Sequence, residues 1–387
     1  MIKIKDPKDC CGCTACASIC AHDAITMEPD VLGFLYPKVD ESKCVDCGLC
    51  EKVCQFNDNY DRSFNLEQPI AYAVRHKDID EVMKSRSGAA FAAISDYILE
   101  QGGVVYGAGY KDHFRVAHKR ATTKEERDEF RGSKYVQSDL TGVFRQVKED
   151  LKNGLTVLFS GTPCQTVGLN AYVGNRLREN LVFVDIVCHG VPSPFIWFDY
   201  IAKIKKEDKR RIVEVDFRDK KHFGWKDHRE SFILDDNSVI TKNDWTTLFY
   251  KHIMFRHSCG VCHFTNTTRP SDITLADFWG WEDAVPGFND DDKGVSLVLL
   301  NTEKGKLLFE KASEDIEIKK VNIDDGLKLN PNLQHPSVIH PNRIQFEKDY
   351  KKHGFRYVFN KYGEAGWRFR IKREIKRIIK KFKNIFV

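Results

Sequence analysis

Eight cysteines near the start of the chain repeat one spacing twice, and this repeat constrains the fold more than any other feature. The spacing is C-x2-C-x2-C-x3-C, and it occurs first in Cys10, Cys13, Cys16 and Cys20 and again in Cys44, Cys47, Cys50 and Cys54. Such a run is typical of bacterial [4Fe–4S] proteins, in which the fourth Cys of each run ligates the other cluster. We therefore predict two [4Fe–4S] clusters, one held by Cys10, Cys13, Cys16 and Cys54 and the other by Cys44, Cys47, Cys50 and Cys20.

Zinc is the main alternative for cysteines at such short spacing. A structural zinc site takes four ligands in a tetrahedron, commonly from two C-x2-C pairs separated by a longer loop. Three closely spaced cysteines followed by a fourth, twice over, fit that pattern poorly. The Pro that often follows the fourth Cys is replaced by Ala21 and Gln55, which removes no ligand. Cys11 is an extra thiol outside the repeat, and we expect it to be a spectator.

The composition favours a soluble protein of a reducing compartment. The chain has 387 residues, of which 42% are hydrophobic and 30% charged, enough for two or three domains at ~150 residues each. No segment reaches the ~18 consecutive apolar residues of a transmembrane helix, and residues 1–11 lack the apolar segment of a signal peptide. Thirteen cysteines without an export signal favour metal binding over disulfides. We expect a cytoplasmic protein.

Positive charge is concentrated at the C-terminal end. Residues 365–387 hold nine Lys or Arg and one Glu, a local charge of +8; the whole chain carries +5, so the rest sums to −3. Residues 1–364 are near neutral and so lack the basic surface that binds nucleic acid, and we expect no such partner. Apolar residues recur at helical spacing along the tail. This pattern is typical of a basic amphipathic helix on a membrane surface, here the inner face; packing against protein is the alternative.

Between these ends, strand-like and helix-like segments alternate. Apolar runs at 71–74, 104–106, 156–159 and 181–187 alternate with helical patterns at 88–101 and 140–152. This order predicts an α/β fold with a mainly parallel sheet and crossover helices. Further strands are expected at 213–217, 231–234 and 295–300. We expect a two-cluster ferredoxin-type domain over 1–60, an α/β domain over 69–350 and the amphipathic helix over 365–387.

Four more cysteines lie outside the repeat, two of them directly after predicted strands. Cys164 and Cys188 follow the runs at 156–159 and 181–187, and the carboxyl ends of parallel strands meet at one edge of a sheet. Pro163 suits the first turn of a helix, so we expect Cys164 at a helix N-terminus, which favours the thiolate. With the pair Cys259 and Cys262, these thiols would ligate a third [4Fe–4S] cluster. Small buried hydrophobes and a redox-active thiol are the alternatives.

Two histidines follow these cysteines directly. His263 completes the c-type haem pattern C-x-x-C-H with Cys259 and Cys262. Haem attachment occurs outside the cytoplasm, so the expected location disfavours haem. His189 follows Cys188 and is a candidate proton donor, with a satisfied polar neighbour as the alternative.

Two polar loops are candidate anion-binding segments. Ser85, Ser87 and Gly88 precede the helical pattern at 88–101, and the free N–H groups of a helix N-terminus suit a phosphate. A plain helix cap is the alternative. Residues 131–135 read Arg-Gly-Ser-Lys-Tyr, a loop with a cation and an aromatic ring or an ordinary turn.

These motifs together resemble the β-subunit family of coenzyme F-420 (deazaflavin) hydrogenases and dehydrogenases. The matching segments are 85–89, 102–107, 132–135, 161–165, 188–193, 259–262 and 272–280, in addition to the cysteine repeat. The family includes bacterial reductases, often encoded near polysaccharide genes, and the plant hydroxymethyl-chlorophyll reductase. Ala89 and Ala276 stand where the family often has Gly.

The resemblance implies a flavin, usually FAD, that exchanges electrons with the clusters. It assigns the flavin to Ser85, Ser87, Gly88, Ser133, Lys134, Tyr135, Gly161 and Thr162. A flavin links the single electrons of clusters to the two that an organic substrate needs. We therefore expect an oxidoreductase that acts on a small organic substrate or cofactor, as in polysaccharide biosynthesis, with His189 as a catalytic candidate. Its electron donor would be a ferredoxin or a partner redox subunit. The alternative is a non-catalytic subunit that relays electrons to a partner enzyme.

Overall fold

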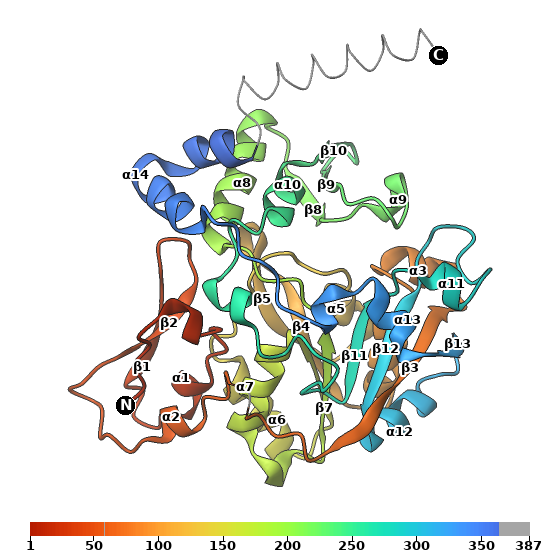
Figure 1. Cartoon of the computed structure of the whole chain (residues 1–387), viewed down its shortest axis with the longest axis horizontal. Coiled ribbons are helices and arrows are strands. Elements are labelled where there is room, and N and C mark those ends of the chain that lie inside the picture. The colour runs from red at the N-terminus through yellow and green to blue at the C-terminus, as the bar shows by residue number, and fades with distance from the viewer. Residues whose placement is uncertain (58, 364–387) are drawn as a thin grey trace.

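The computed structural model describes residues 1–57 and 59–363 (Figure 1). The amphipathic helix expected over 365–387 lies outside the described residues, so its membrane contact stays a prediction. Among the described helices, none has the length and apolar character needed to span a bilayer.

Residues 1–57 form a small cysteine-rich module. Its elements are η1 (Pro7–Asp9), α1 (Ala15–Ile19), β1 (Ile25–Pro29), β2 (Leu35–Val39) and α2 (Leu49–Lys52). Strand β1 pairs antiparallel with β2. Both short helices begin directly after a left-handed residue, Thr14 at φ 67° and Gly48 at φ 73°. Each cysteine run is therefore a loop that turns sharply into a single turn of helix.

An eight-stranded sheet forms the body of the molecule. Its order is β13 (Ile316–Val321), β3 (Asn65–His76), β12 (Ser296–Thr302), β11 (Ile273–Asp277), β7 (Leu181–Ile186), β6 (Val157–Gly161), β4 (Val104–Lys111) and β5 (Arg115–Ala121). Each predicted run, at 71–74, 104–106, 156–159, 181–187 and 295–300, lies inside one of these strands with at most one residue outside it, although β3 and β4 extend well beyond their runs. The α/β class is confirmed.

The expectation of a mainly parallel sheet is wrong. Parallel pairing is confined to β4, β6, β7 and β11, whereas β5, β12, β3 and β13 pair antiparallel with their neighbours. The reason is clear at β4 and β5, which only residues 112–114 connect. A parallel pair needs a crossover of about a dozen residues or more, so this link can form only a hairpin.

Helices cover both faces of the sheet. The larger ones are α4 (Ala90–Glu100), α6 (Val143–Lys152), α7 (Pro163–Val173) and α12 (Glu303–Lys311), and the shorter ones are α3 (Ile79–Lys84), α5 (Lys124–Asp128), α11 (Trp281–Ala284) and α13 (Ile323–Lys328). Along β6, Val157 and Phe159 pack in the core of α6 and α7, and Leu158 between them packs in the core of α4 and α12. This alternation is what a two-residue period produces in a strand covered on both faces.

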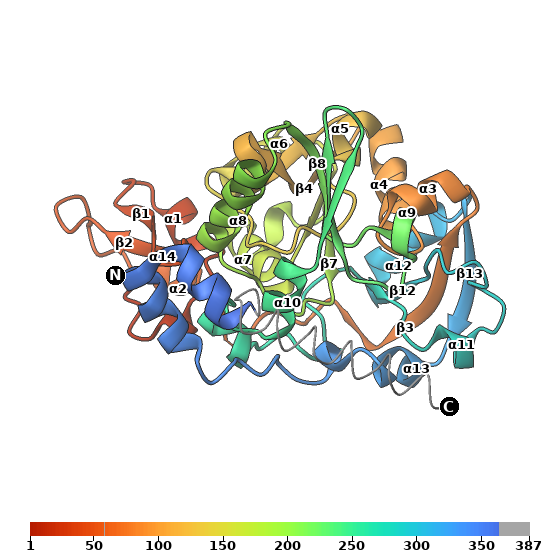
Figure 2. The ribbon, with the colours of Figure 1, turned by 90° about the horizontal axis from the view of Figure 1, so that it is seen from above.

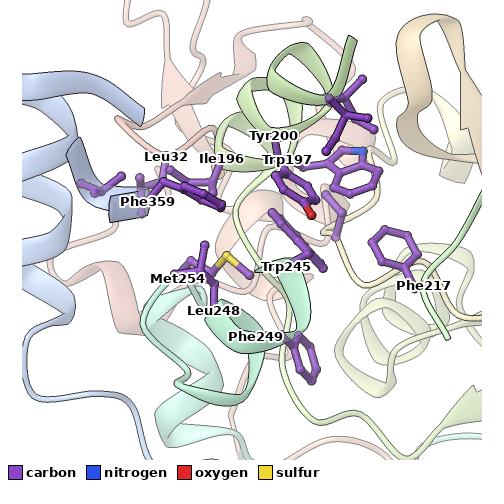
Figure 3. Close-up of a cluster of buried hydrophobic side chains, with 14 of the residues drawn as sticks. Leu32, Ile196, Trp197, Tyr200, Phe217, Trp245, Leu248, Phe249, Met254 and Phe359 are labelled. Atoms are coloured by element: carbon purple, nitrogen blue, oxygen red, sulfur yellow. The ribbon is translucent and has the colours of Figure 1, made fainter. Parts of the chain in front are cut away.

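A smaller layer sits beside this body. The three-stranded antiparallel sheet is β8 (Ile212–Asp216), β9 (Glu230–Leu234) and β10 (Val239–Lys242), accompanied by α8 (Pro194–Glu207), α9 (Lys220–Phe223), α10 (Asp244–Tyr250) and α14 (Arg343–Tyr362). Connecting 3-10 turns are η2 (Asp112–Phe114), η3 (Asn175–Leu177), η4 (His257–Val261) and η5 (Pro331–Leu333). Figure 3 shows the aromatic core of this layer, built around Trp197, Tyr200 and Trp245.

Two separate cores fix the cysteine-rich module to the rest of the chain. Ala15, Cys16 and Ile25 belong to the core of α6 and α7. Leu32 and Phe34 belong to the aromatic core, where Figure 3 shows Leu32 near Ile196 of α8. Both overall views place the module at one end of the molecule, opposite β13 (Figures 1 and 2). This docking brings the first cysteine run close to α7 and η4.

Candidate iron–sulfur and flavin sites

The first predicted set of ligands comes together in the cysteine-rich module. Burial raises the pKa of the Cys16 thiol, and the charges of Cys13, Cys10 and Cys54 raise it further. Burial also raises the pKa of Cys10, where Cys13 and Cys54 again contribute. Thiols that influence one another in this way face a shared space. Cys54, from the second run, therefore lies with three thiols of the first run.

The second predicted set lines one cavity. The cavity measures about 380 Å³, is open to solvent, and is lined by Cys20, Cys44, Cys47 and Cys50 among others. Two of these sulfurs accept backbone hydrogen bonds, Cys50 Sγ from Ile2 N at 3.2 Å and Cys20 Sγ from Ala24 N at 3.4 Å. Hydrogen bonds to sulfur are one of the means by which a protein sets a cluster's potential. Cys47 is exposed, so this site reaches the surface.

The remaining four predicted ligands line a second cavity, of about 600 Å³, which Cys164, Cys188, Cys259 and Cys262 share. Strands β6 and β7 are parallel neighbours, so the loops that follow them carry Cys164 and Cys188 to the same edge. Burial and then the charges of Cys259, Cys164 and Cys262 raise the pKa of Cys188 well above its usual value. The structure thus brings all four thiols to one place.

The helix expected after β6 is present. Thr162 caps α7, Pro163 is its first residue, and Cys164 follows in the first turn. The backbone N–H of Thr162 donates to Gln165 Oε1 at 2.9 Å, which closes the cap. A hydrogen bond with Cys11, opposed by burial and helped by Thr162, lowers the pKa of Cys164 to about 7. The position of Cys164 at a helix N-terminus is as the sequence predicted.

The spacing of these thiols can be compared with what zinc requires. Within residues 1–57 and 59–363, no three His, Cys, Asp or Glu side chains are gathered tightly enough to hold a single metal ion. Zinc binds thiolates at about 2.3 Å, so its ligands crowd one point. A [4Fe–4S] cluster instead takes four thiolates, one at each corner of a larger body. Four thiols that surround a shared space are therefore a suitable set of ligands for a [4Fe–4S] cluster, and they suit zinc less well.

Cys11 is not the isolated spectator that its position outside the repeat suggested. It is buried and lines the cavity of about 600 Å³. Hydrogen bonds with Cys13 and Cys164, followed by burial, raise its pKa well above the usual value. Cys11 therefore lies between the first and third sets of thiols.

His189 borders the third set of thiols but is fixed by its neighbours. Its Nε2 lies 2.7 Å from Nε2 of His252, and its ring stacks on Phe249 at 5.3 Å. Burial, and then the charge of His252, lowers the pKa of His189 to about 4. The imidazole is neutral at physiological pH, so it offers an N–H donor rather than a cation.

The predicted flavin residues divide into two groups. Ser85, Ser87 and Gly88 lie between α3 and α4, where Ser87 Oγ donates to Val295 O at 2.5 Å and Gly88 N to Ser296 Oγ at 3.0 Å. Ser133 lies in the loop between α5 and α6 with the two residues that follow it. Arg86 links these segments, because it lies within electrostatic reach of Tyr135.

The other predicted flavin residues, Gly161 and Thr162, lie at the end of β6. Thr162 lines the cavity of the third thiol set, and a Cβ at Gly161 would meet Gln165 Oε1 at 2.9 Å and His118 Nε2 at 3.3 Å. Lys134 lies within electrostatic reach of the same His118, so the loop at 133–135 lies near this strand end.

Lys134 and Tyr135 are held by close contacts. Lys134 Nζ donates to Arg131 O at 2.9 Å and to Glu129 O, and burial of its ammonium lowers its pKa to about 7. The ring of Tyr135 packs edge-on against Phe249, with ring centres 4.9 Å apart. This loop presents an aromatic ring and a weakly basic amine.

Sequence reasoning missed a buried group of charges beside these loops. Arg218 Nη1 donates to Asp277 Oδ2 at 2.5 Å, and Lys220 Nζ donates to Ser87 O at 3.2 Å. Among the described residues, the buried Nε atoms of Arg86 and Arg218 have no hydrogen-bond partner. Arg86 stands between Ser85 and Ser87, so its place in that loop was the signal that could have found it. Arg218 and Lys220 belong to no recognisable local motif.

Unsatisfied guanidinium nitrogens suit an anion. Arg86 faces Asp216 at 3.6 Å and Arg218 pairs with Asp277, and each arginine still has a buried Nε without a hydrogen-bond partner that could bind an anion. Trp225 and Trp279 stack 4.5 Å apart next to them, and Arg218 lies over Trp279. Phosphate groups and flat rings are the two chemical features of FAD, so the residues present fit this cofactor.

Comparisons with known proteins match two parts of the chain to family models. Residues 154–326 match the family model for the C terminus of the coenzyme F420 hydrogenase/dehydrogenase beta subunit, and residues 9–57 match the model "4Fe-4S dicluster domain". A similar solved chain comes from the F420-reducing [NiFe] hydrogenase complex of Methanosarcina barkeri, solved as a xenon derivative. It is 17% identical with a TM-score of 0.47, over 77% of this chain and 92% of that chain. No curated protein matches the chain. Over residues 154–326 the chain therefore carries a domain similar to the C terminus of the coenzyme F420 hydrogenase/dehydrogenase beta subunit, and this domain follows a 4Fe-4S dicluster domain.

Proposed function

We propose that this protein is an iron–sulfur flavoprotein oxidoreductase that exchanges electrons between three [4Fe–4S] clusters, FAD and a small organic substrate or cofactor. The observation that carries the proposal is the grouping of twelve cysteines into three sets. Two sets lie in the cysteine-rich module, and the third lines a cavity at the ends of β6 and β7. Cys11 connects the first set to the third.

The third set supports a cluster better than it supports a packed core. A core thiol is surrounded by apolar atoms, but Cys164, Cys188, Cys259 and Cys262 surround a space of about 600 Å³. Thiols that converge on one solvent-open cavity are placed as ligands rather than as core packing. The four sulfurs would therefore be ligands, and the neighbouring backbone would hold them in place; Val191 N, for example, donates to Cys259 Sγ at 3.4 Å.

Residues between the large and small sheets would hold FAD. Arg86 and Arg218 would bind its phosphates through their unpartnered Nε atoms, and Tyr135 and Trp279 would contact its rings. When bound, the flavin supplies conversion between one-electron and two-electron chemistry. His189 would be the candidate proton donor beside the substrate, with its ring held by His252.

Electrons would enter at the second thiol set. Cys47 is exposed there, and two apolar side chains beside it also face solvent, Val45 at 60% and Leu49 at 45%. An exposed apolar rim around a redox site suits transient contact with another protein. The electron donor would be a ferredoxin or a partner redox subunit.

Anaerobic purification with iron, sulfide and flavin quantitation tests the proposal. Three clusters give about 12 irons per chain, at four per cluster, together with one FAD. About eight irons would remove the third cluster. A chain with iron but without flavin after reconstitution would leave the second hypothesis, a subunit that relays electrons to a partner enzyme.

The substrate and the location need separate tests. Precursors of polysaccharide synthesis are the first substrate class to assay, with reduced ferredoxin as donor. We also propose a cytoplasmic location with residues 365–387 against the inner membrane face. Cosedimentation of the full chain with anionic vesicles, but not with neutral ones, is expected, because each nearby Lys or Arg contributes ~1 kcal/mol to binding anionic lipid. Recovery with neither vesicle type would argue against membrane contact, and equal recovery with both would argue against attraction by anionic lipid.

A further inference from the structure

Arg256 lies at the boundary between the body and the cysteine-rich module. Its backbone belongs to the third thiol set: Arg256 N donates to Val191 O at 3.0 Å, and Cys259 N donates to Arg256 O at 3.1 Å. The residue is fully buried and lines the cavity of about 600 Å³. Its position is therefore fixed by the same loops that carry Cys188 and Cys259.

The side chain of Arg256 reaches across to the first thiol set. Its Nε donates to Cys10 O at 2.8 Å, and its Nη2 donates to Leu35 O at 2.9 Å and lies 3.6 Å from Cys10 Sγ. Its Nη1 donates to Gln137 Oε1 at 3.0 Å. The guanidinium also lies over the ring of Tyr36, at 4.2 Å. One side chain thus contacts a predicted cluster ligand 246 residues away.

The cysteine run is shaped to admit this guanidinium. Gly12 lies between Cys11 and Cys13 with φ 72°. A Cβ at Gly12 would meet Arg256 Nη1 at 2.8 Å, closer than real Cβ contacts allow. The loop therefore has no side chain where Arg256 approaches.

Arg256 differs from the other buried arginines in its partners. Arg178 pairs with Asp272 at 2.8 Å and Arg269 with Asp185 at 3.0 Å. No described carboxylate lies within ion-pair distance of Arg256, whose polar partners are carbonyl and amide oxygens and the Cys10 sulfur. A buried cation without a counter-ion is costly. The negative charge of four thiolates around a cluster would compensate it.

We propose that Arg256 is a positioning residue that sets the reduction potential of the cluster held by Cys10, Cys13, Cys16 and Cys54. Reduction transfers one electron from the external donor to this cluster and so adds one negative charge beside the guanidinium. The cation therefore stabilises the reduced form, because cluster potentials respond to nearby charge and to hydrogen bonds on sulfur. This inference rests on the proposed cluster ligation.

An EPR-monitored redox titration of the full-length, anaerobically reconstituted protein tests the role, with dithionite as reductant. Substitution Arg256→Gln is expected to lower the midpoint potential of the first cluster at unchanged iron content. We expect at least a tenfold weaker reduction equilibrium, which is about 59 mV for one electron. Arg256→Lys keeps the charge and is expected to recover most of the potential. The first cluster's signal is identified by its change in Cys16→Ser.

Two further variants keep the test decisive. Gln137→Glu places a carboxylate on Arg256 Nη1 with almost no change in shape, so it is expected to lower the same potential even if Arg256→Gln fails to assemble. Arg145→Gln is the matched control, because Arg145 also contacts the module, at Cys20 O (3.1 Å), but is exposed and paired with Asp23. It is expected to leave the potential unchanged.

Each outcome has a clear meaning. Unchanged potentials in Gln137→Glu, and in Arg256→Gln where it assembles, would overturn the role of Arg256. An equal shift in Arg145→Gln would overturn it as well, because the effect would not depend on burial. A wild-type protein without clusters would instead contradict the proposed ligation itself.

Discussion

His118 Nε2 lies 2.9 Å from the carbonyl oxygen of Ser160, at the end of the strand that leads to Cys164. The other ring nitrogen lies 2.8 Å from Ser138 Oγ, and the ring stacks on Phe159 with centres 5.0 Å apart. Burial lowers the pKa of His118 to about 4. A neutral imidazole therefore joins β5, the loop before α6 and β6 just below the third thiol set.

This depressed pKa predicts a loss of stability in acid. Between pH 6.5 and 4 the unfolded chain binds a proton at His118 that the folded chain does not, so stability falls as pH is lowered through this window. The difference between the folded and unfolded pKa values corresponds to roughly 3 kcal/mol of unfolding free energy, at about 1.36 kcal/mol per pKa unit. Urea unfolding of wild type and His118→Gln at pH 7 and 4.5 measures it. The variant is expected to lose less stability on acidification; an identical loss would contradict the assignment.

If the fourth cysteine of each run ligates the cluster of the other run, this predicts which cysteine variants change the same EPR signal. Cys54→Ser is expected to change the EPR signal that Cys16→Ser changes, and Cys20→Ser the signal that Cys47→Ser changes, because each pair faces one space. Each substitution removes a ligand and is expected to lower iron by up to about four atoms per chain. If Cys20→Ser instead changes the Cys16 signal, the two runs do not cross.

The contact between α7 and the module predicts the effect of one added methyl group. Gly168 faces Cys13, and a Cβ there would meet Cys13 Sγ at 2.7 Å. Gly168→Ala favours the helix by about 1 kcal/mol but displaces a cluster ligand. We expect loss of the first cluster, measured as iron per chain, with normal helical circular dichroism. Asn170→Ala, on the same helix, is the control and is expected to retain all its iron.

The unpartnered arginines predict where FAD binds. Arg86→Gln is expected to weaken FAD binding at least tenfold, about 1.4 kcal/mol, because Arg86 Nε is buried without a partner. Quenching of flavin fluorescence on titration into apoprotein measures the dissociation constant. Arg229→Gln alters an exposed arginine directly before β9 and serves as control. Equal affinities in wild type and Arg86→Gln would place the flavin elsewhere.

Local patterns accounted for the elements but not for their pairing. The run at 104–106 predicts a strand because its residues are apolar and β-prone, and β4 contains it. Nothing in that run shows that β5 returns beside it, because the pairing depends on the short link at 112–114. The flanking antiparallel strands were therefore missed although every predicted run is a strand.

The same limit applies to the sites. Cys164 and Cys188 could be placed together from the sequence because strand ends share one edge. Arg256 could not be placed, since its contact with Cys10 crosses 246 residues and leaves no local spacing to read. The position of Cys11 could not be predicted for a similar reason, because its neighbour Cys164 comes from another part of the chain.

The attachment of the cysteine-rich module through two hydrophobic cores has a mechanical consequence. Leu32 and Phe34 are anchored in one core, and Ala15 and Ile25 in another, so the module has no hinge about which to rotate. The module therefore cannot carry electrons by moving as a rigid domain between separate binding positions. In the proposed function, electrons would therefore tunnel between the cofactors over distances that the folded structure fixes, and only the external donor would have to move.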